Sequence, residues 1–366
     1  MPASDRSHIF GPVQSGRLGA SLGLDLLGAK ICSFDCLYCE VGATVAKTCA
    51  RKPYAPAEKI LGELAGWLSL PHPAFDVVTL GGMGEPTLNS DLGAIIEGVH
   101  RMLPGVPVAV LTNSSLMLES SVRTELALAD IVLPSMDTLV PAEFAQLNRP
   151  QAGISLVDIR RGLKSFRALY PGKIYLEVLL LSGVNDSQDN LERLRDFCAE
   201  LLPDRVDVVT MTRPGAFAGA RPATPAAMER FRKGLHDAPA GHPASGVGCP
   251  FSDVGSPAPD TGSPTPEIPE KARHFAAPLD NAPQEGLEAL TTRVLDSLAR
   301  RPQTAAGLAR ALGVSEETLT NLLNDLALRE LIHPSHFSGE TFYLRGAAER
   351  NPGRNPGRCP GRSPDR

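Results

Sequence analysis

The stretch Cys32-Ser-Phe-Asp-Cys36-Leu-Tyr-Cys39 is the most informative part of this 366-residue sequence. It places three of the seven cysteines at the spacing C-x3-C-x2-C, directly after an apolar run that predicts the first strand. Three thiolates so close together can hold one face of an iron–sulfur cluster, and the absence of a fourth nearby cysteine leaves one metal position open. A zinc knuckle and chance clustering are the alternatives, but zinc sites usually pair two C-x2-C units. We therefore predict a cluster held by Cys32, Cys36 and Cys39.

Apolar runs alternate with helical patterns from residue 20 to about residue 235. The expected strands are 22–27, 77–80, 108–111, 131–133, 174–180 and 206–209. The expected helices are 57–68, 91–102, 119–127, 155–169, 187–201 and 224–235. Most of the strands are continuous apolar runs, which is typical of a parallel sheet buried on both faces. Six β-then-α units imply a sheet that either stays open or curls into a barrel, and the pattern alone does not choose between them.

The composition changes after residue 238, which predicts a division of the chain into four parts. Residues 1–238 form the core, and residues 239–285 form a linker rich in proline, with ten prolines between positions 239 and 283. Residues 286–346 contain three helical patterns (287–299, 304–312 and 315–328) and a hairpin pattern at 331–344, an order typical of a winged-helix domain. Residues 347–366 carry an NPGR repeat that cannot build a core, and we expect them to be disordered.

The cysteine motif, its position after the first strand and the six βα units resemble the radical S-adenosylmethionine (SAM) superfamily. The resemblance implies that Cys32, Cys36 and Cys39 hold a [4Fe–4S] cluster whose fourth iron is chelated by SAM. Tyr38 matches the aromatic residue before the last cysteine and would lie near the adenine of SAM. It also implies an α/β fold, a partial (βα)6 TIM-like barrel with its site at the carboxyl ends of the strands.

A second motif, Gly81-Gly-Met-Gly84-Glu85-Pro-Thr-Leu, follows the second expected strand about 40 residues after the cysteines. Glycines at such a position let the backbone approach a ligand closely, although they are also common in turns. The resemblance assigns Gly82, Gly84 and Glu85 to SAM binding. The local form G-x-G-E-P-T-L is similar to one in the branch that includes wyosine-forming tRNA enzymes, and the chain looks like bacterial proteins distantly related to them.

Polar residues also follow the later strands, at the end of the barrel where a cofactor would bind. By resemblance Asn113, Ser135 and Asp137 are further SAM contacts, whereas the alternative is that they start turns and cap helices. Ser182 and Asn185 are weaker candidates of the same kind, and Arg213, after the sixth expected strand, is a candidate for substrate binding. Among the scattered cysteines, Cys49 alone lies near the expected site.

The predicted function is that of a radical SAM enzyme, in which a 5′-deoxyadenosyl radical abstracts hydrogen from a substrate. The resemblance implies an electron donor such as flavodoxin or ferredoxin. It leaves the substrate open between a nucleic acid, a peptide and a small molecule. No second cluster motif and no basic face are evident, so a tRNA reaction is not carried over.

The alternative is a regulator that senses SAM or its cluster and binds DNA through the C-terminal domain. The expected recognition helix, 315–328, contains Glu316, Glu317 and Asp325 and no lysine or arginine, which argues against DNA because phosphate contacts need cations. The net charge of −5 also gives no support to a broad cationic surface. No run of about 18 apolar residues is present, and the N-terminus is polar, so we expect no membrane contact and a cytoplasmic protein.

Overall fold

The computed structural model describes residues 7–236 and 286–346. The expected linker (239–285) and the expected disordered tail (347–366) lie outside the described residues. The four-part division of the chain therefore stays a prediction.

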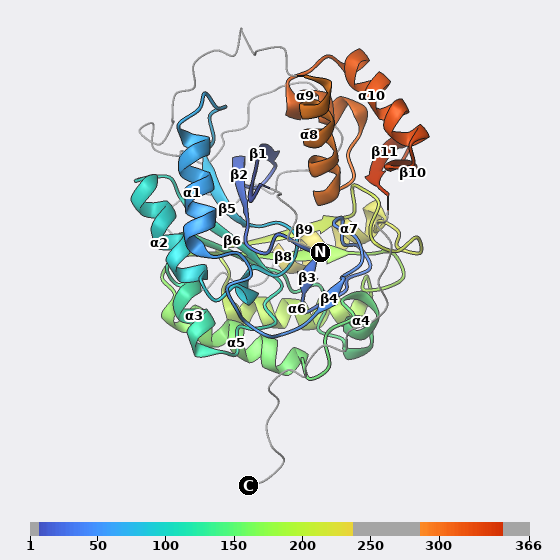
Figure 1. The fold of residues 1–366 in the computed structure, drawn as a ribbon. Helices are drawn as coiled ribbons and strands as arrows, with labels where there is room; N and C mark the ends of the chain where they lie inside the picture. Colours follow the sequence, from blue (N-terminus) through green and yellow to red (C-terminus); the bar gives the residue numbers. More distant parts are fainter. Residues whose placement is uncertain (1–6, 237–285, 347–366) are drawn as a thin grey trace, which may run out of the picture.

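A seven-stranded sheet forms the centre of the structure (Figure 1). In spatial order its strands are β1 (Ile9–Ser15), β2 (Gly19–Asp25), β5 (Val77–Gly81), β6 (Val108–Thr112), β7 (Ile131–Pro134), β8 (Lys173–Leu180) and β9 (Arg205–Thr210). β1 pairs antiparallel with β2, and all the other neighbours are parallel. The six strands expected from the sequence are all present, and the α/β class is confirmed.

The sheet is curled into a half-barrel. From β2 to β9 the strands lie in the order in which they occur in the chain, so no reversal opens the sheet at a switch point. The two edges of the sheet approach each other. Arg205 Nη2 on β9 donates a hydrogen bond of 3.5 Å to the carbonyl of Arg17 in the β1–β2 turn. Of the two architectures left open by the sequence, the curled sheet is therefore the one observed.

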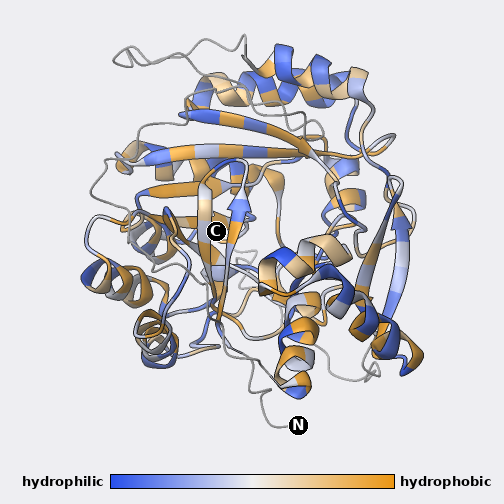
Figure 2. Cartoon of the chain, turned by 90° about the horizontal axis from the view of Figure 1, so that it is seen from above, coloured by the Kyte–Doolittle hydropathy of each residue, from blue (hydrophilic) through white to orange (hydrophobic). Residues whose placement is uncertain are grey.

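Helices connect the strands and pack on the outer face of the sheet (Figure 1). They are α1 (Ala57–Leu68), α2 (Leu92–Met102), α3 (Ser120–Leu126), α4 (Pro141–Leu147), α5 (Leu156–Leu169), α6 (Gln188–Leu201) and α7 (Pro225–His236). All except α4 were expected. Figure 2 shows their mixed surfaces, in which hydrophobic residues alternate with hydrophilic ones along each helix.

Along each strand, successive side chains point alternately toward the helices and toward the concave side of the sheet. On β5, Val78 and Leu80 belong to the main apolar core with the helices, whereas Val77 belongs to a small cluster on the opposite face. β8 alternates more clearly than predicted for a continuous apolar run, since Leu176 and Val178 are fully buried while Glu177 between them is half-buried. The concave face of the half-barrel therefore carries charged side chains from its last strands.

Short elements absent from the predictions lie around the cysteine motif. They are β3 (Ile31–Cys32), β4 (Ala46–Lys47) and the 3-10 helix η1 (Pro86–Leu88). β3 and β4 form a small parallel sheet of their own, which fixes the backbone at the first cysteine.

The C-terminal module contains three helices and a hairpin, in the expected order. They are α8 (Leu287–Arg300), α9 (Ala305–Leu312), α10 (Glu316–Leu328), β10 (Ile332–Phe337) and β11 (Glu340–Arg345). Side-chain caps begin two of the helices: Thr304 accepts from the Gly307 amide, and Ser315 accepts from the Thr318 amide. The module has its own apolar core of leucine-rich helix faces. Its assignment to the winged-helix class stays a prediction.

The module contacts the barrel through Arg300 and Phe337. The Arg300 guanidinium donates to the Ser7 carbonyl at 2.5 Å and lies 3.9 Å from the Asp25 carboxylate. Phe337 packs against an apolar cluster that includes Met211. Within the described ranges, no helix is long and apolar enough to cross a membrane.

Candidate functional site

The three cysteines of the motif come together at the carboxyl ends of the strands. Cys32 ends β3 and is buried, whereas Cys36 and Cys39 lie in the following loop and are half-buried. All three are free thiols. Burial raises the pKa of Cys36 well above its usual range, and the nearby Cys32 and Cys39 sulfurs raise it further.

Three neighbouring free thiols are the donor set that an iron–sulfur cluster takes. Over the described part of the chain, no three or more His, Cys, Asp or Glu side chains converge as the ligands of one ion. A zinc site requires such convergence, with four ligands at about 2.0–2.3 Å from one metal. An iron–sulfur cluster instead takes one thiolate per iron, so its cysteines are spread around a larger body.

Each of the three sulfurs lies near one side-chain nitrogen from a different segment. The pairs are Lys30 Nζ–Cys39 Sγ (2.9 Å), Asn113 Nδ2–Cys32 Sγ (3.4 Å) and Asn148 Nδ2–Cys36 Sγ (3.5 Å). Donors of this kind stabilise the anionic form of sulfur and orient metal ligands. The protein therefore surrounds the motif with groups suited to a negatively charged cluster.

A narrow pocket beside the cysteines brings four of the predicted cofactor residues together. Its lining residues are Phe34, Tyr38, Asn113, Ser135, Met136, Asp137, Thr138, Phe144, Asn148 and Ile159. The predicted residues in this list come from the cysteine loop and from the ends of β6 and β7, segments distant in the sequence. Their convergence follows from the parallel sheet, which places all the carboxyl ends at one rim.

Asp137 connects the segments around this pocket through hydrogen bonds. Its Oδ2 accepts hydrogen bonds from Tyr38 Oη at 2.6 Å and from Asn148 Nδ2 at 2.9 Å, and its Oδ1 accepts from the Leu179 amide at 3.0 Å. Burial raises the pKa of the carboxyl, and these three donors oppose that rise. Since protein donors already contact both oxygens, the geometry supports Asp137 as a group that positions Tyr38.

The glycine-rich loop lies in backbone contact with the cysteine motif. A Cβ atom on Gly84 would lie 1.7 Å from the Ile31 carbonyl oxygen, which also accepts a hydrogen bond of 3.1 Å from the Glu85 amide. Gly82 has a φ of +99°, a conformation that favours glycine, and its Cα is exposed to solvent. The two predicted motifs therefore form one structural unit.

Glu85 is almost fully buried inside this unit, with an exposed fraction of 2%. Its Oε1 accepts hydrogen bonds from the hydroxyls of Thr87 and Thr112 at 2.6 and 2.7 Å, and its Oε2 accepts from the Asn113 amide at 2.6 Å. Glu85 therefore fixes the backbone of Asn113, whose side chain contacts the sulfur of Cys32. Its assignment as a direct SAM contact stays a prediction.

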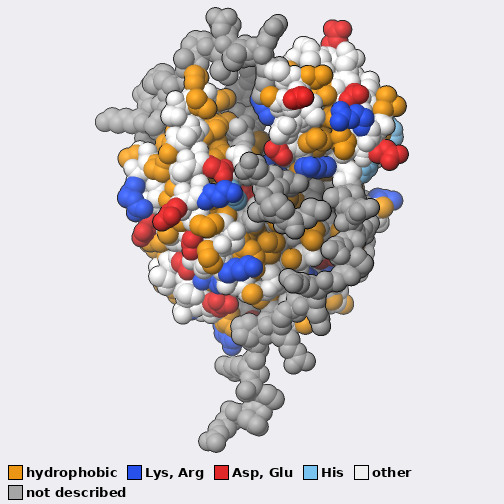
Figure 3. Space-filling model, viewed as in Figure 1, with side chains coloured by type: hydrophobic (Ala, Val, Ile, Leu, Met, Phe, Trp, Pro, Cys, Tyr) orange, Lys and Arg blue, Asp and Glu red, His pale blue; other side chains and the backbone are white. Residues whose placement is uncertain are grey.

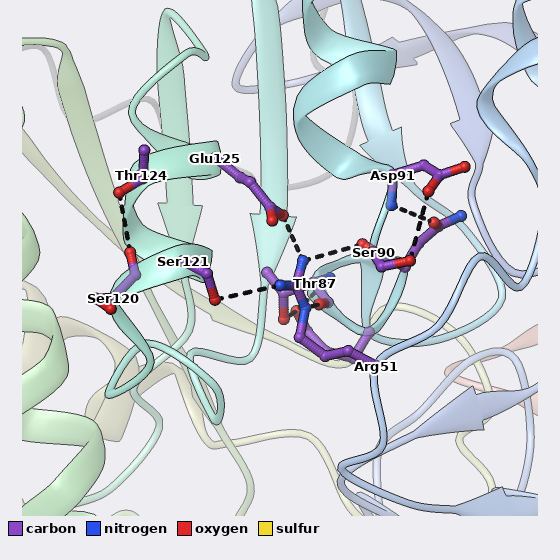
Figure 4. Close-up of polar contacts among 10 residues, drawn as sticks. Arg51, Thr87, Ser90, Asp91, Ser120, Ser121, Thr124 and Glu125 are labelled. Carbon is purple, nitrogen blue, oxygen red and sulfur yellow. Dashed lines mark hydrogen bonds and ion pairs between the residues drawn. The ribbon is translucent and has the colours of Figure 1, made fainter.

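Arg51 supports the glycine-rich loop from the outside (Figure 4). Its Nε donates to the Thr87 carbonyl at 2.8 Å, and its Nη2 donates to the Asn89 carbonyl at 3.3 Å and forms an ion pair with Glu125 on α3. A third nitrogen, Nη1, reaches Ser121 Oγ at 3.5 Å. One side chain thus connects the segment after the cysteines, the end of η1 and helix α3.

The weaker candidates lie around the same rim in different roles. Asn185 is fully buried and donates to the carbonyls of Asp137 and Leu179, so it fixes the backbone at a residue that lines the pocket. Ser182 is fixed through its backbone amide, and Arg213 forms an ion pair of 3.4 Å with Glu40. Cys49 is buried in the main core.

Three residues at the site were not singled out as candidates from the sequence. Asn148 belongs to the L-N-R-P segment, where only its place in the three-dimensional structure reveals the contacts with Cys36 and Asp137. Lys30 offered a signal, a single cation inside an apolar run two residues before the first cysteine. A Cβ atom on Gly215 would lie 2.8 Å from the Leu37 carbonyl oxygen, which requires glycine beside the cysteine loop.

Comparisons with known proteins show which proteins this chain is similar to. The sequence profile described as "Radical SAM superfamily" matches residues 27–197. A UPF0026 protein of Synechocystis sp. is 37% identical over 207 residues, which are 56% of this chain and 76% of that protein. A Brachyspira hyodysenteriae protein described as "GTPase Obg" is 35% identical over 226 residues, 62% of this chain, but this chain spans only 33% of its length.

Among solved structures, a radical SAM methyltransferase from Sphaerobacter thermophilus is similar to this chain. The match has a TM-score of 0.44 and 15% sequence identity, and it covers 59% of this chain and 63% of that one.

Proposed function

Because the chain belongs to the radical SAM superfamily and to the UPF0026 family, we propose that it cleaves SAM reductively to drive hydrogen abstraction from a substrate. Radical SAM enzymes use a [4Fe–4S] cluster and SAM as cofactors, and this chain is an enzyme of that kind. When bound, the cluster supplies one electron to the sulfonium of SAM, which gives methionine and a 5′-deoxyadenosyl radical.

The observation that carries the proposal is the set of three sulfur–nitrogen pairs beside the pocket. Cys32, Cys36 and Cys39 would hold the cluster, and their nitrogen partners would stabilise its negative charge. The pocket lies beside the cysteine loop, and two of its lining residues, Asn113 and Asn148, contact the sulfurs of Cys32 and Cys36.

The other residues of the site bind and orient. The aromatic ring of Tyr38, fixed by its hydroxyl on Asp137, offers a flat apolar face for the adenine of SAM. Backbone groups of the loop around Gly82 are open to a polar ligand group, and Glu85 maintains the conformation of that region. Phe34 and Phe144 pack edge to face at 5.5 Å and make the inner wall of the pocket apolar, which helps to exclude water.

The finer parts of the proposal concern ancestry, partners and location. We infer a distant relationship to wyosine-forming tRNA enzymes from the G-x-G-E-P-T-L loop, and a winged-helix class for residues 286–346 from three helices followed by a hairpin. The proposed electron donor is a flavodoxin or ferredoxin, and the proposed location is the cytoplasm. On the face seen in Figure 3, cationic and anionic side chains of the described residues are interspersed, which supports a substrate or protein contact over a DNA contact.

The experiment that tests this function is measurement of 5′-deoxyadenosine. Protein reconstituted anaerobically with iron and sulfide is mixed with SAM and dithionite, and the nucleosides are separated by chromatography. We expect 5′-deoxyadenosine and methionine in equal amounts. A protein that holds four irons and binds SAM but forms neither product would contradict the proposal.

A further inference from the structure

Arg301 lies at the junction of the barrel and the C-terminal module, and no described residue forms a direct ion pair with it. It follows helix α8 directly and is half-buried. Its guanidinium forms no hydrogen bond or ion pair with any residue in the described ranges, although the neighbouring Arg300 forms several. Burial lowers the pKa of Arg301, and the nearby Arg213 lowers it further, whereas Glu40 has the opposite effect.

Arg213 and Arg301 share a single carboxylate. Arg213 Nη1 lies 3.4 Å from Glu40 Oε2, and Glu40 directly follows the cluster ligand Cys39 in the chain. Glu40 also interacts electrostatically with Arg17, which is itself ion-paired with Glu177 on the concave face of β8. One glutamate therefore lies among three arginines, and only two of these have a carboxylate partner.

The charged side chains that are linked to one another through Glu40 and Arg17 do not balance. The cations are Arg17, Arg205, Arg213 and Arg301, and the anions are Glu40, Glu177 and Asp207. Four positive and three negative charges leave a net charge of +1 in this group. A half-buried guanidinium next to a like charge is unfavourable unless an anion joins the group.

The group is continuous with the proposed SAM pocket. Ser135, which lines that pocket, donates to Glu177 Oε1 at 3.5 Å, and Glu177 pairs with Arg17. At the same rim, Phe337 of the module packs in an apolar cluster with Tyr38 and Met211. The module therefore contributes an apolar side chain to the cluster that Tyr38 also contacts, and a cationic side chain near Arg213 and Glu40.

We propose that Arg301 and Arg213 bind an oxyanion, a phosphate or a carboxylate, carried by the substrate. The proposal rests on the proposed function, because it assigns the substrate class of the same site. Each guanidinium group offers parallel N–H donors that match the oxygens of a phosphate or a carboxylate. It also gives the C-terminal module a role: Arg301 completes the substrate site from outside the barrel.

The test uses the full-length reconstituted protein and two probes, inorganic pyrophosphate and malonate. Affinities are measured by titration calorimetry at low ionic strength for the wild type, Arg301→Met and Arg213→Met. The matched control is Arg310→Met, an exposed arginine of the same module whose side chain, among the described residues, bonds only a backbone carbonyl of its own helix, at 3.4 Å. We expect the wild type to bind at least one probe, with a loss of about tenfold or more in Arg301→Met and Arg213→Met and no change in Arg310→Met.

The two probes separate the two sources of the oxyanion. Tighter binding of pyrophosphate indicates a phosphate-bearing substrate, and tighter binding of malonate indicates a carboxylate. Binding of neither probe, or equal losses in Arg301→Met and Arg310→Met, would overturn the inference. Competition between saturating SAM and the probe in the wild type would also overturn it, because the arginines would then hold the carboxylate of SAM.

Failure of this inference can be distinguished from failure of the proposed function. 5′-Deoxyadenosine formation by the same wild-type preparation reports on SAM cleavage, and the calorimetry reports on the arginines. Cleavage without oxyanion binding contradicts only the substrate class, and oxyanion binding without cleavage contradicts only the radical chemistry.

Discussion

The ammonium group of Lys30 lies 2.9 Å from the sulfur of Cys39, and no other side-chain or backbone acceptor contacts it among the described residues. Lys30 is 8% exposed. Burial by itself would lower the pKa of Lys30, but the sulfurs of Cys39 and Cys32 outweigh burial and raise it. The lysine therefore stays positive at neutral pH and would stabilise a negative charge at the cysteines.

Replacing Lys30 with methionine should shift the midpoint potential of the cluster to more negative values. Methionine has a similar length and no charge, so the reduced cluster, which carries one more electron, loses more stabilisation than the oxidised one. A redox titration followed by electron paramagnetic resonance measures the potential. Lys30→Arg is the matched control and should stay closer to the wild type; an unchanged potential in Lys30→Met would contradict the assigned role.

Replacing Cys36 with alanine should remove the cluster and leave the barrel folded. Cys36 is half-buried and the change removes a single sulfur atom, which lies beside the side chain and carbonyl of Asn148, so its loss opens no large cavity. Cys198→Ala is the control, because Cys198 is also a free thiol but is buried in α6, where burial raises its pKa to about 12. Iron analysis should find about four irons in Cys198→Ala and almost none in Cys36→Ala. Equal iron contents would show that the ligands are elsewhere.

Replacing Gly84 with alanine should disrupt both motifs at once. The new Cβ would lie 1.7 Å from the Ile31 carbonyl oxygen, so the glycine-rich loop and β3 must move apart. We expect a loss of about 1–3 kcal/mol of unfolding free energy, as for other overpacked positions, and poor incorporation of iron. Gly66→Ala in α1 is the control, because no atom lies within 4 Å of its added Cβ, and it should be neutral or slightly stabilising. Normal iron incorporation in Gly84→Ala would mean that the loops are not coupled.

The parallel strands and most helices could be predicted because their sequence patterns are local. The run at 77–80, for example, is apolar throughout, as expected for a strand between two packed layers. The edge strand Ile9–Ser15 was missed because half-exposed residues and a Gly-Pro pair interrupt its pattern. Helix α4 has only seven residues and begins at a proline, and it is too short for a periodic signal.

The candidate site also combines local features, which the sequence predicts, with contacts between distant segments, which it does not. The three cysteines lie within one short segment, so their spacing can be recognised in the sequence. The nitrogen partners of the sulfurs include Asn148, which is 112 positions from Cys36 and whose alignment with it depends on the curl of the whole sheet. The contact between Arg205 and Arg17 spans 188 positions, and no sequence pattern signals that closure.

Replacing Arg300 with methionine should make the stability of the protein more sensitive to pH. Burial raises the pKa of Asp25 above the ordinary aspartate value, whereas hydrogen bonds from the Met83 and Leu27 amides and the charge of Arg300 oppose the rise. A carboxyl whose pKa is raised in the folded state binds its proton more tightly there than in the unfolded state. Stability is therefore lost as the pH rises from the ordinary value, about 3.9, through the folded pKa.

Removing Arg300 takes away a cation 3.9 Å from Asp25, so the folded pKa of Asp25 should rise further. The destabilisation caused by Arg300→Met should thus be smaller at pH 4 than at pH 7, by roughly 1 kcal/mol for one partly shielded ion pair. Urea unfolding at both pH values measures it. The mutation also removes the hydrogen bond to Ser7, but that loss does not depend on pH.

A second variant isolates the charge interaction from that hydrogen bond. Asp25→Asn keeps the Oδ1 acceptor for the Met83 and Leu27 amides and removes the charge near Arg300. In the Asp25→Asn background, Arg300→Met should cost the same free energy at both pH values. If the cost of Arg300→Met is the same at pH 4 and pH 7 in the wild-type background as well, the charge of Arg300 does not act on Asp25.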